Sequence, residues 1–175
     1  MIKSLTLPDP ERDHILGSAD GSMQLLEYGD YECPSCGDAH LIVKEIKRRL
    51  VDDLLFAFRN FPIANIHPHA EHAAEAAEAA AEQGDFWGMH DRLFENQSAL
   101  EDQDIAGYAA ELSLDATQLI QKVVSSAYAP RIREDFKSGV RADVNGTPTF
   151  FINGERYDGA FDLGHFLNAL TSQSA

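Results

Sequence analysis

Segments with strand character stand near both ends of this chain, whereas its long middle is helical, and this order restricts the fold more than any other feature. Short apolar runs at residues 24–28 and 54–62 predict two buried strands with a helix between them. From residue 67 to about residue 139, nearly every segment has helical spacing or a helix cap. Strand character returns at residues 149–152, and the Asn153–Gly154 pair that follows is a strong hairpin signal. This order predicts an α/β fold with helices inserted between two halves of one sheet.

Length, composition and charge set the class of protein. With 175 residues, of which 44% are hydrophobic and 25% charged, the chain is expected to form one globular domain, or one domain with an insertion. Its formal net charge of −15 repels phosphate backbones, so we expect no nucleic-acid partner. No apolar run is long enough to cross a bilayer, and residues 1–22 contain no stretch that resembles a signal-peptide core. We therefore expect no membrane partner and a cytoplasmic location, or a periplasmic or extracellular one if a leader has been removed.

The first inserted helix has two contrasting sets of residues. One face carries small side chains and suits close helix packing, and it consists of Ala70, Ala73, Ala74, Ala77, Ala80 and Ala81. The glutamates lie largely opposite this face and are interpreted as a solvated stripe, which consists of Glu71, Glu75, Glu78 and Glu82. Later helices are expected to begin after the capping residues Asp85, Asp115 and Asp162.

Cys33 and Cys36 are the two cysteines of the chain, and the spacing of this pair has three interpretations. A disulfide that closed so short a loop would contribute roughly 2 kcal/mol, which is little for a cytoplasmic chain with an adequate core. A structural zinc site needs four ligands, and histidines such as His67, His69 or His72 do not form a second ligand pair on a tight turn. A redox-active dithiol is the interpretation that the surrounding residues favour.

Each residue of the CPSC segment has a physical reason to be there if the pair is redox-active. Cys33 follows a strand and a turn and precedes a helix, so we expect it near the helix N-cap. Pro34 suits the first helical position, because it lacks the N–H that would be unpaired there. The N–H groups of Ser35 and Cys36 can point at the Cys33 sulfur, and together with the helix dipole they favour the thiolate. Cys33 is therefore the predicted nucleophile, and Cys36, one turn further in, is the more buried partner.

Three stretches of the sequence resemble the DsbA-like thiol-disulfide oxidoreductases, in particular a bacterial branch that often lacks a signal peptide. They are RDHILGSADGSMQLLEYGDYECPSCG (residues 12–37), GDFWGMHDRLFENQ (residues 84–97) and VNGTPTFFINGERYDG (residues 144–159). The resemblance implies a thioredoxin-like fold with an inserted all-helical domain. Residues 1–62 and 128–175 would then form the thioredoxin-like core, and residues 63–127 the helical insertion. Because the electrons reside in the cysteine pair, neither an organic cofactor nor a metal is required.

The resemblance also assigns roles to residues outside the CPSC segment. In this family the Pro that corresponds to Pro148, preceded here by Thr147, is in the cis form and faces the cysteines. The backbone of Thr147 would then be available to pair with an extended substrate. Glu27, six residues before Cys33, corresponds to a buried carboxylate that exchanges protons with the inner thiol in this family. Its neighbours in the sequence are apolar, which favours burial.

Two features depart from the strongly oxidising periplasmic member of this family. Ser35 stands where that enzyme has a histidine, so the dipeptide supplies no positive charge beside the thiolate. Asp30 and Glu32, immediately upstream of Cys33, would disfavour the thiolate slightly if their charges lay close to it. We therefore do not expect an extreme oxidising power.

The sequence predicts an enzyme, a protein thiol-disulfide oxidoreductase that exchanges disulfides with protein or peptide thiols. Glutathione or a thioredoxin-type reductant are further candidate partners. Cys33 attacks or is attacked, a mixed disulfide forms, and Cys36 resolves it. Two alternatives share the fold. One is a peptide-binding or chaperone-like module with incidental cysteines, and the other is a glutathione-dependent isomerase or transferase, against which the second cysteine argues.

Overall fold

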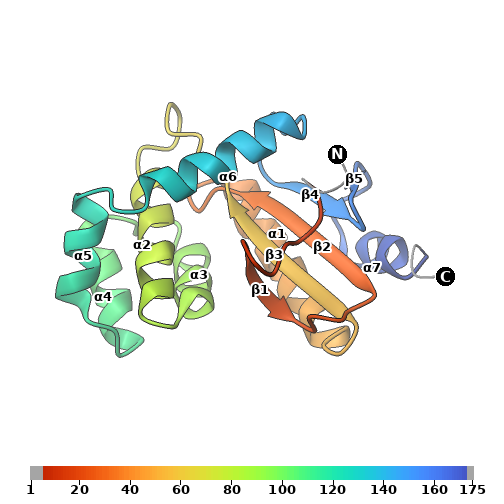
Figure 1. Cartoon of the computed structure of the whole chain (residues 1–175), viewed down its shortest axis with the longest axis horizontal. Helices are drawn as coiled ribbons and strands as arrows, with labels where there is room; N and C mark the ends of the chain where they lie inside the picture. The colour runs from red at the N-terminus through yellow and green to blue at the C-terminus, as the bar shows by residue number, and fades with distance from the viewer. Residues whose placement is uncertain (1–5, 173–175) are drawn as a thin grey trace. The chain divides into compact units, whose positions relative to one another are not determined.

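The computed structural model describes residues 6–172 of the chain, and within them the order of strands and helices confirms the predicted α/β plan (Figure 1). The strands form one sheet in the order β1–β3–β2–β4–β5. They are β1 (His14–Gly17), β2 (Met23–Gly29), β3 (Leu54–Asn60), β4 (Thr149–Ile152) and β5 (Glu155–Tyr157). The helices are α1 (Pro34–Arg49), α2 (Ala70–Glu82), α3 (Phe86–Glu95), α4 (Asp102–Glu111), α5 (Ala116–Val124), α6 (Ala129–Arg141) and α7 (Leu163–Ser172). None of the helices described is long and apolar enough to cross a membrane.

The chain divides into two compact units. The first contains the residues up to 29, residues 38–59 and the residues from 137 on, and so it holds the sheet. The second contains residues 30–37 and 60–136, and so it holds α2 to α5. The CPSC segment consequently belongs to the second unit, whereas Glu27 and Pro148 belong to the first.

In the first unit, a strand–helix–strand motif forms the centre of the sheet. β2 and β3 run in the same direction and are connected by α1, which lies against one face of the sheet (Figure 1). β1 pairs antiparallel with β3, β4 with β2, and β5 with β4. Asn153 and Gly154 connect β4 to β5 with positive φ angles of 49° and 83°, which is the backbone conformation that the hairpin signal predicts.

β3 is covered on both faces, because all seven of its residues are buried. Its Arg59 is only 1% exposed. The guanidinium donates hydrogen bonds to Asp13 Oδ1 (2.9 Å) and Oδ2 (2.8 Å) and a third to the hydroxyl of Tyr28 (2.8 Å). A buried charge is tolerated when it is paired and hydrogen-bonded in this way. The ion pair thus links the segment before β1 to the middle of the sheet.

In the second unit, α2 is the central helix and contacts α3, α4 and α5. Its predicted small-residue face is largely confirmed, since Ala70, Ala73, Ala74, Ala77 and Ala80 are all buried. The predicted caps are confirmed as well. Asp85 accepts from Gly88 N and Asp115 from Gln118 N, each at 2.9 Å, and in the first unit Asp162 accepts from His165 N at 3.0 Å.

The predicted solvated stripe of glutamates on α2 is wrong for Glu75 and Glu78, which are each only 3% exposed. Their partners come from the start of α6 and the end of β3. The backbone N–H of Tyr128 donates to Glu75 Oε2 (2.8 Å), and Arg131 Nε donates to Glu78 Oε2 (2.8 Å). The Asn60 amide donates a further hydrogen bond to Glu78 Oε1 (3.1 Å). These partners allow two carboxylates to be buried in the helical unit.

Burial changes the titration of Glu75. It raises the pKa of this carboxyl to about 7, because the charged form loses its solvation. His72 opposes the rise, whereas the negative charges of Glu78 and Glu71 add to it. Glu75 therefore takes up or loses its proton near neutral pH.

Candidate redox site

The two cysteines lie at the beginning of α1. Pro34 is the first residue of this helix, as predicted, so Cys33 immediately precedes it and Cys36 lies in its first turn. Cys33 is 7% exposed and Cys36 0%, which is the predicted order of burial. The N–H of Cys36 donates to the Cys33 carbonyl oxygen (3.0 Å), as the N–H of Gly37 also does (3.2 Å).

Gln97, which follows α3, holds the segment around Cys33, and this contact was not predicted. Its Nε2 donates to the carbonyl oxygens of Tyr31 (2.9 Å) and Cys33 (2.8 Å). The close approach requires a glycine at position 37, since a Cβ on Gly37 would lie 2.1 Å from Gln97 Oε1. Gln97 is separated from the cysteines by about 60 residues, and no local sequence pattern could have connected the two.

Tyr31, two residues before Cys33, is buried in an aromatic cluster. Its hydroxyl forms a hydrogen bond with His90 Nδ1 (3.0 Å), and its ring lies 4.8 Å from that of Phe94. The rings of Phe86 and Trp87 pack edge-on against each other at 4.9 Å beside His90. The Tyr31 hydroxyl thus has a hydrogen-bond partner within this cluster, and the cluster packs around the turn that precedes Cys33.

The two acidic residues upstream of Cys33 each have a histidine partner. Asp30 Oδ2 accepts from the backbone N–H of Ile63 (2.8 Å) and forms a hydrogen bond with His67 Nδ1 (2.8 Å). Glu32 Oε2 accepts from the backbone N–H of His69 (2.6 Å), and its Oε1 forms a hydrogen bond with His69 Nδ1 (2.9 Å). Both carboxylates are thus paired with residues of the segment that precedes α2.

His67, His69 and His72 are the histidines that a zinc site at the cysteines would have had to recruit. The structure gives each of them a different carboxylate at Nδ1, at distances of 2.7 to 2.9 Å; the pairs are His67–Asp30, His69–Glu32 and His72–Asp102. An arrangement of three separate pairs differs from the convergent, tetrahedral ligand set of a structural zinc ion. The zinc interpretation therefore gains no support from their geometry.

The remaining predicted site residues lie in the first unit, Glu27 on β2 and Thr147 and Pro148 just before β4. Glu27 is 1% exposed, as its apolar neighbours predict. β2 pairs with β4 such that Tyr28 is opposite Thr149, so the C-terminal end of β2 lies beside the N-terminal end of β4. The peptide bond between Thr147 and Pro148, just before β4, is cis, and both residues are partly exposed.

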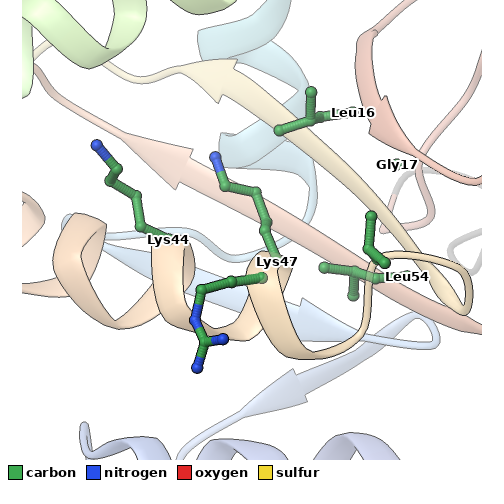
Figure 2. A pocket seen from close by; sticks show the side chains of 7 residues that line it. Leu16, Gly17, Lys44, Lys47 and Leu54 are labelled. Carbon is green, nitrogen blue, oxygen red and sulfur yellow. The ribbon is translucent and has the colours of Figure 1, made fainter.

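A pocket of about 370 Å³ lies at the opposite end of α1 from the cysteines. Figure 2 shows the side chains of Lys44 and Lys47 extending from the same side of the helix. The other lining residues are Gly17, Arg48, Val51 and Leu54. None of the predicted site residues lines this pocket.

Comparisons with known proteins place the chain among relatives that are much longer. A family model described as thioredoxin matches residues 9–171. The Na(+)/H(+) antiporter NhaA 1 of Salinispora arenicola is 41% identical over 99% of this chain. The protein of the same name from Mycobacterium sp. (strain KMS) is 44% identical over 93% of it. In both cases the match covers 27% of the relative, so the chain spans about a quarter of the length of these curated proteins.

Solved structures show the fold. BdbD from Bacillus subtilis superposes with a TM-score of 0.85 and 22% identity, covering 96% of either chain. The α-DsbA1 protein of Wolbachia pipientis superposes with a TM-score of 0.84 and 20% identity, covering 99% of this chain and 96% of that one. The predicted thioredoxin-like fold, in the form found in DsbA-type proteins, is confirmed.

Proposed function

We propose that this chain, which belongs to the thioredoxin family, is a thiol-disulfide oxidoreductase whose reactive pair is Cys33 and Cys36. The observation that carries the proposal is the placement of the pair at the start of α1, with Cys33 before the first helical residue and Cys36 in the first turn. A thiol at a helix N-terminus is biased toward thiolate by the helix dipole. The fold alone would not support the proposal, because one fold can carry many functions.

The proposed reaction is an exchange of two electrons between the pair and a client disulfide. The Cys33 thiolate attacks one client sulfur, a mixed disulfide forms, and the other client sulfur leaves as a thiolate. Cys36 loses its proton and attacks Cys33, which expels the second client thiolate and leaves a Cys33–Cys36 disulfide. The client has then gained two electrons and the pair has lost two, and the reverse sequence oxidises a client dithiol.

Other residues have supporting roles in the proposal. Pro34 begins the helix without presenting an unpaired N–H, and Ser35 supplies a backbone N–H near the N-terminus without adding charge. The family resemblance assigns proton exchange with Cys36 to Glu27, whose burial is consistent with such a group. It assigns the docking of an extended client segment to the backbone of Thr147, next to Pro148.

The proposed clients are protein or peptide thiols and disulfides. Glutathione or a thioredoxin-type protein would return the cysteine pair to its starting redox state after each turnover. The curated relatives are named as sodium/proton antiporters, and that name belongs to proteins about four times as long as the matched segment. The present proposal concerns thiol exchange by the segment shared with them.

Turnover separates this proposal from the alternative of a peptide-binding module with incidental cysteines. We expect the wild type to catalyse the reduction of insulin by dithiothreitol and the Cys33→Ser variant to be inactive. The binding of a cysteine-free peptide serves as the control, because both proteins should bind it equally if the variant is folded. Equal insulin reduction by the two proteins would overturn the proposal and leave the binding module as the better account.

A further inference from the structure

Glu32 occupies a defined position between the reactive cysteine and the start of α2. Its carboxylate accepts two hydrogen bonds from the same residue, one from the backbone N–H of His69 (2.6 Å) and one at Nδ1 of the His69 ring (2.9 Å). His69 is the N-cap residue of α2, so the carboxylate also lies at the positive end of a helix dipole. The residue that immediately precedes Cys33 is thereby fixed to a different secondary-structure element.

The ring of His69 can change its charge in solution, because 42% of its side chain is exposed, whereas the side chain of Glu32 is 18% exposed. The hydrogen bond to Glu32 raises the pKa of His69, and the charges of Glu32, Glu101 and Asp102 act in the same direction against the cost of burial. Glu101 and Asp102 belong to the start of α4, and Asp102 is itself paired with His72 of α2 (2.7 Å). When His69 is a cation the pair with Glu32 is neutral, and when the ring loses its proton the pair carries a net negative charge.

We propose that His69 is a positioning residue for the Cys33 thiol, in that it holds the Glu32 carboxylate and compensates the negative charge next to the nucleophile. The proposal rests on the function proposed above, since it assumes that the ionisation of Cys33 matters. Glu32 and Cys33 are neighbours in the chain, and consecutive Cα atoms are about 3.8 Å apart, which is less than the screening length of about 8 Å at physiological salt. A nearby negative charge disfavours a thiolate.

The substitution His69→Gln removes the positive charge of the histidine ring and keeps a hydrogen-bond donor to Glu32 at the same position. The backbone N–H of residue 69, which forms the shorter of the two hydrogen bonds, remains, and a glutamine amide can still donate to the carboxylate. What is lost is the positive charge. We expect the pKa of Cys33 to rise by roughly 0.3 to 1 unit, which corresponds to a two- to tenfold lower rate of alkylation at a fixed pH below that pKa.

The test is a double-mutant cycle in a protein that carries Cys36→Ala, so that Cys33 is the thiol that reacts. Its four members are this reference protein, His69→Gln, Glu32→Gln and the double variant. The rate of iodoacetamide alkylation is measured against pH to obtain the pKa of Cys33. We expect His69→Gln to raise this pKa and Glu32→Gln to lower it. In the double variant, the His69 substitution should have no further effect, because the charge that it leaves uncompensated is gone.

His72→Gln is the matched control. It breaks the same kind of contact, a histidine Nδ1 on a carboxylate at 2.7 Å, one helical turn along α2 and with a carboxylate that is remote from Cys33 in the sequence. We expect it to leave the pKa of Cys33 unchanged. If His69 had a purely structural role, His69→Gln and Glu32→Gln would each raise the pKa of Cys33 or leave it unchanged. An effect of His69→Gln on this pKa that persists in the Glu32→Gln background would overturn the proposal.

The alkylation cycle does not depend on turnover. If wild-type insulin reduction fails while the cycle shows the expected coupling, the proposed function is wrong and the charge compensation stands. If turnover is observed and the cycle shows no coupling, the inference about His69 is wrong and the proposed function stands.

Discussion

The substitution Gly37→Ala tests whether Gln97 holds the segment that contains Cys33. A Cβ at position 37 would lie 2.1 Å from Gln97 Oε1 and 2.7 Å from its Cδ, distances that real Cβ contacts do not show. The Gln97 side chain would have to move away. Its hydrogen bonds to the carbonyl oxygens of Tyr31 and Cys33 would then be lost.

The expected magnitude follows from two opposing effects. The loss of two hydrogen bonds destabilises the fold by about 2 kcal/mol in total, at about 1 kcal/mol each. Alanine is more favourable than glycine within a helix by about 1 kcal/mol, and Gly37 lies within α1. We therefore expect Gly37→Ala to lower the free energy of unfolding by about 1 kcal/mol, as the net of these terms.

The assay is urea unfolding of four proteins: wild type, Gly37→Ala, Gln97→Ala and the double variant. In the Gln97→Ala background the obstacle to a methyl group is absent, so Gly37→Ala should there raise the free energy of unfolding by about 1 kcal/mol. The effect of Gly37→Ala on the free energy of unfolding should thus differ by about 2 kcal/mol between the two backgrounds, and it should have opposite signs in them. An equal effect of Gly37→Ala in both backgrounds would refute the argument that Gln97 packs against this turn.

Two further predictions concern buried carboxylates. The pKa of Glu75 in the folded protein is raised from 4.5 to about 7, so the folded state binds more protons than the unfolded state within this window, and stability falls as the pH rises through it. Glu75→Gln should remove this dependence and raise the free energy of unfolding at pH 8 by on the order of 1–3 kcal/mol; parallel stability–pH curves for the two proteins would contradict the assignment. Glu27→Gln should slow the release of a preformed mixed disulfide by Cys36 while leaving peptide affinity unchanged, and an unchanged release rate between roughly pH 6 and 8 would exclude proton transfer by Glu27.

Features set by neighbouring residues in the chain could be predicted from the sequence. The start of α1 follows from Pro34 directly after a strand and turn, and the caps formed by Asp85 and Asp115 depend on N–H groups three residues away. The turn at Asn153 and Gly154 is equally local. Each of these signals acts within a few residues, so no knowledge of the tertiary structure was needed.

Features set by distant residues could not be predicted. A glutamate on a regular helix is normally solvated, and the burial of Glu75 and Glu78 depends on Tyr128 and Arg131, which lie 53 residues further along the chain. The contact of Gln97 with the Cys33 carbonyl likewise joins segments whose proximity arises only on folding. Roles for Glu27 and Pro148 came from the family resemblance, because nothing in their own sequence surroundings specifies that chemistry.

The central claim, that Cys33 attacks and Cys36 resolves, is tested most directly by trapping the mixed disulfide. Cys36→Ala and Cys33→Ser are each incubated with a disulfide-containing client and separated on a non-reducing gel, with and without dithiothreitol. Only Cys33 precedes the helix, and Cys36 is the fully buried member of the pair, so the two variants should behave differently. We expect Cys36→Ala to accumulate a client adduct that dithiothreitol dissolves, and Cys33→Ser to form none. Equal adduct formation by the two variants, or none by either, would contradict the account.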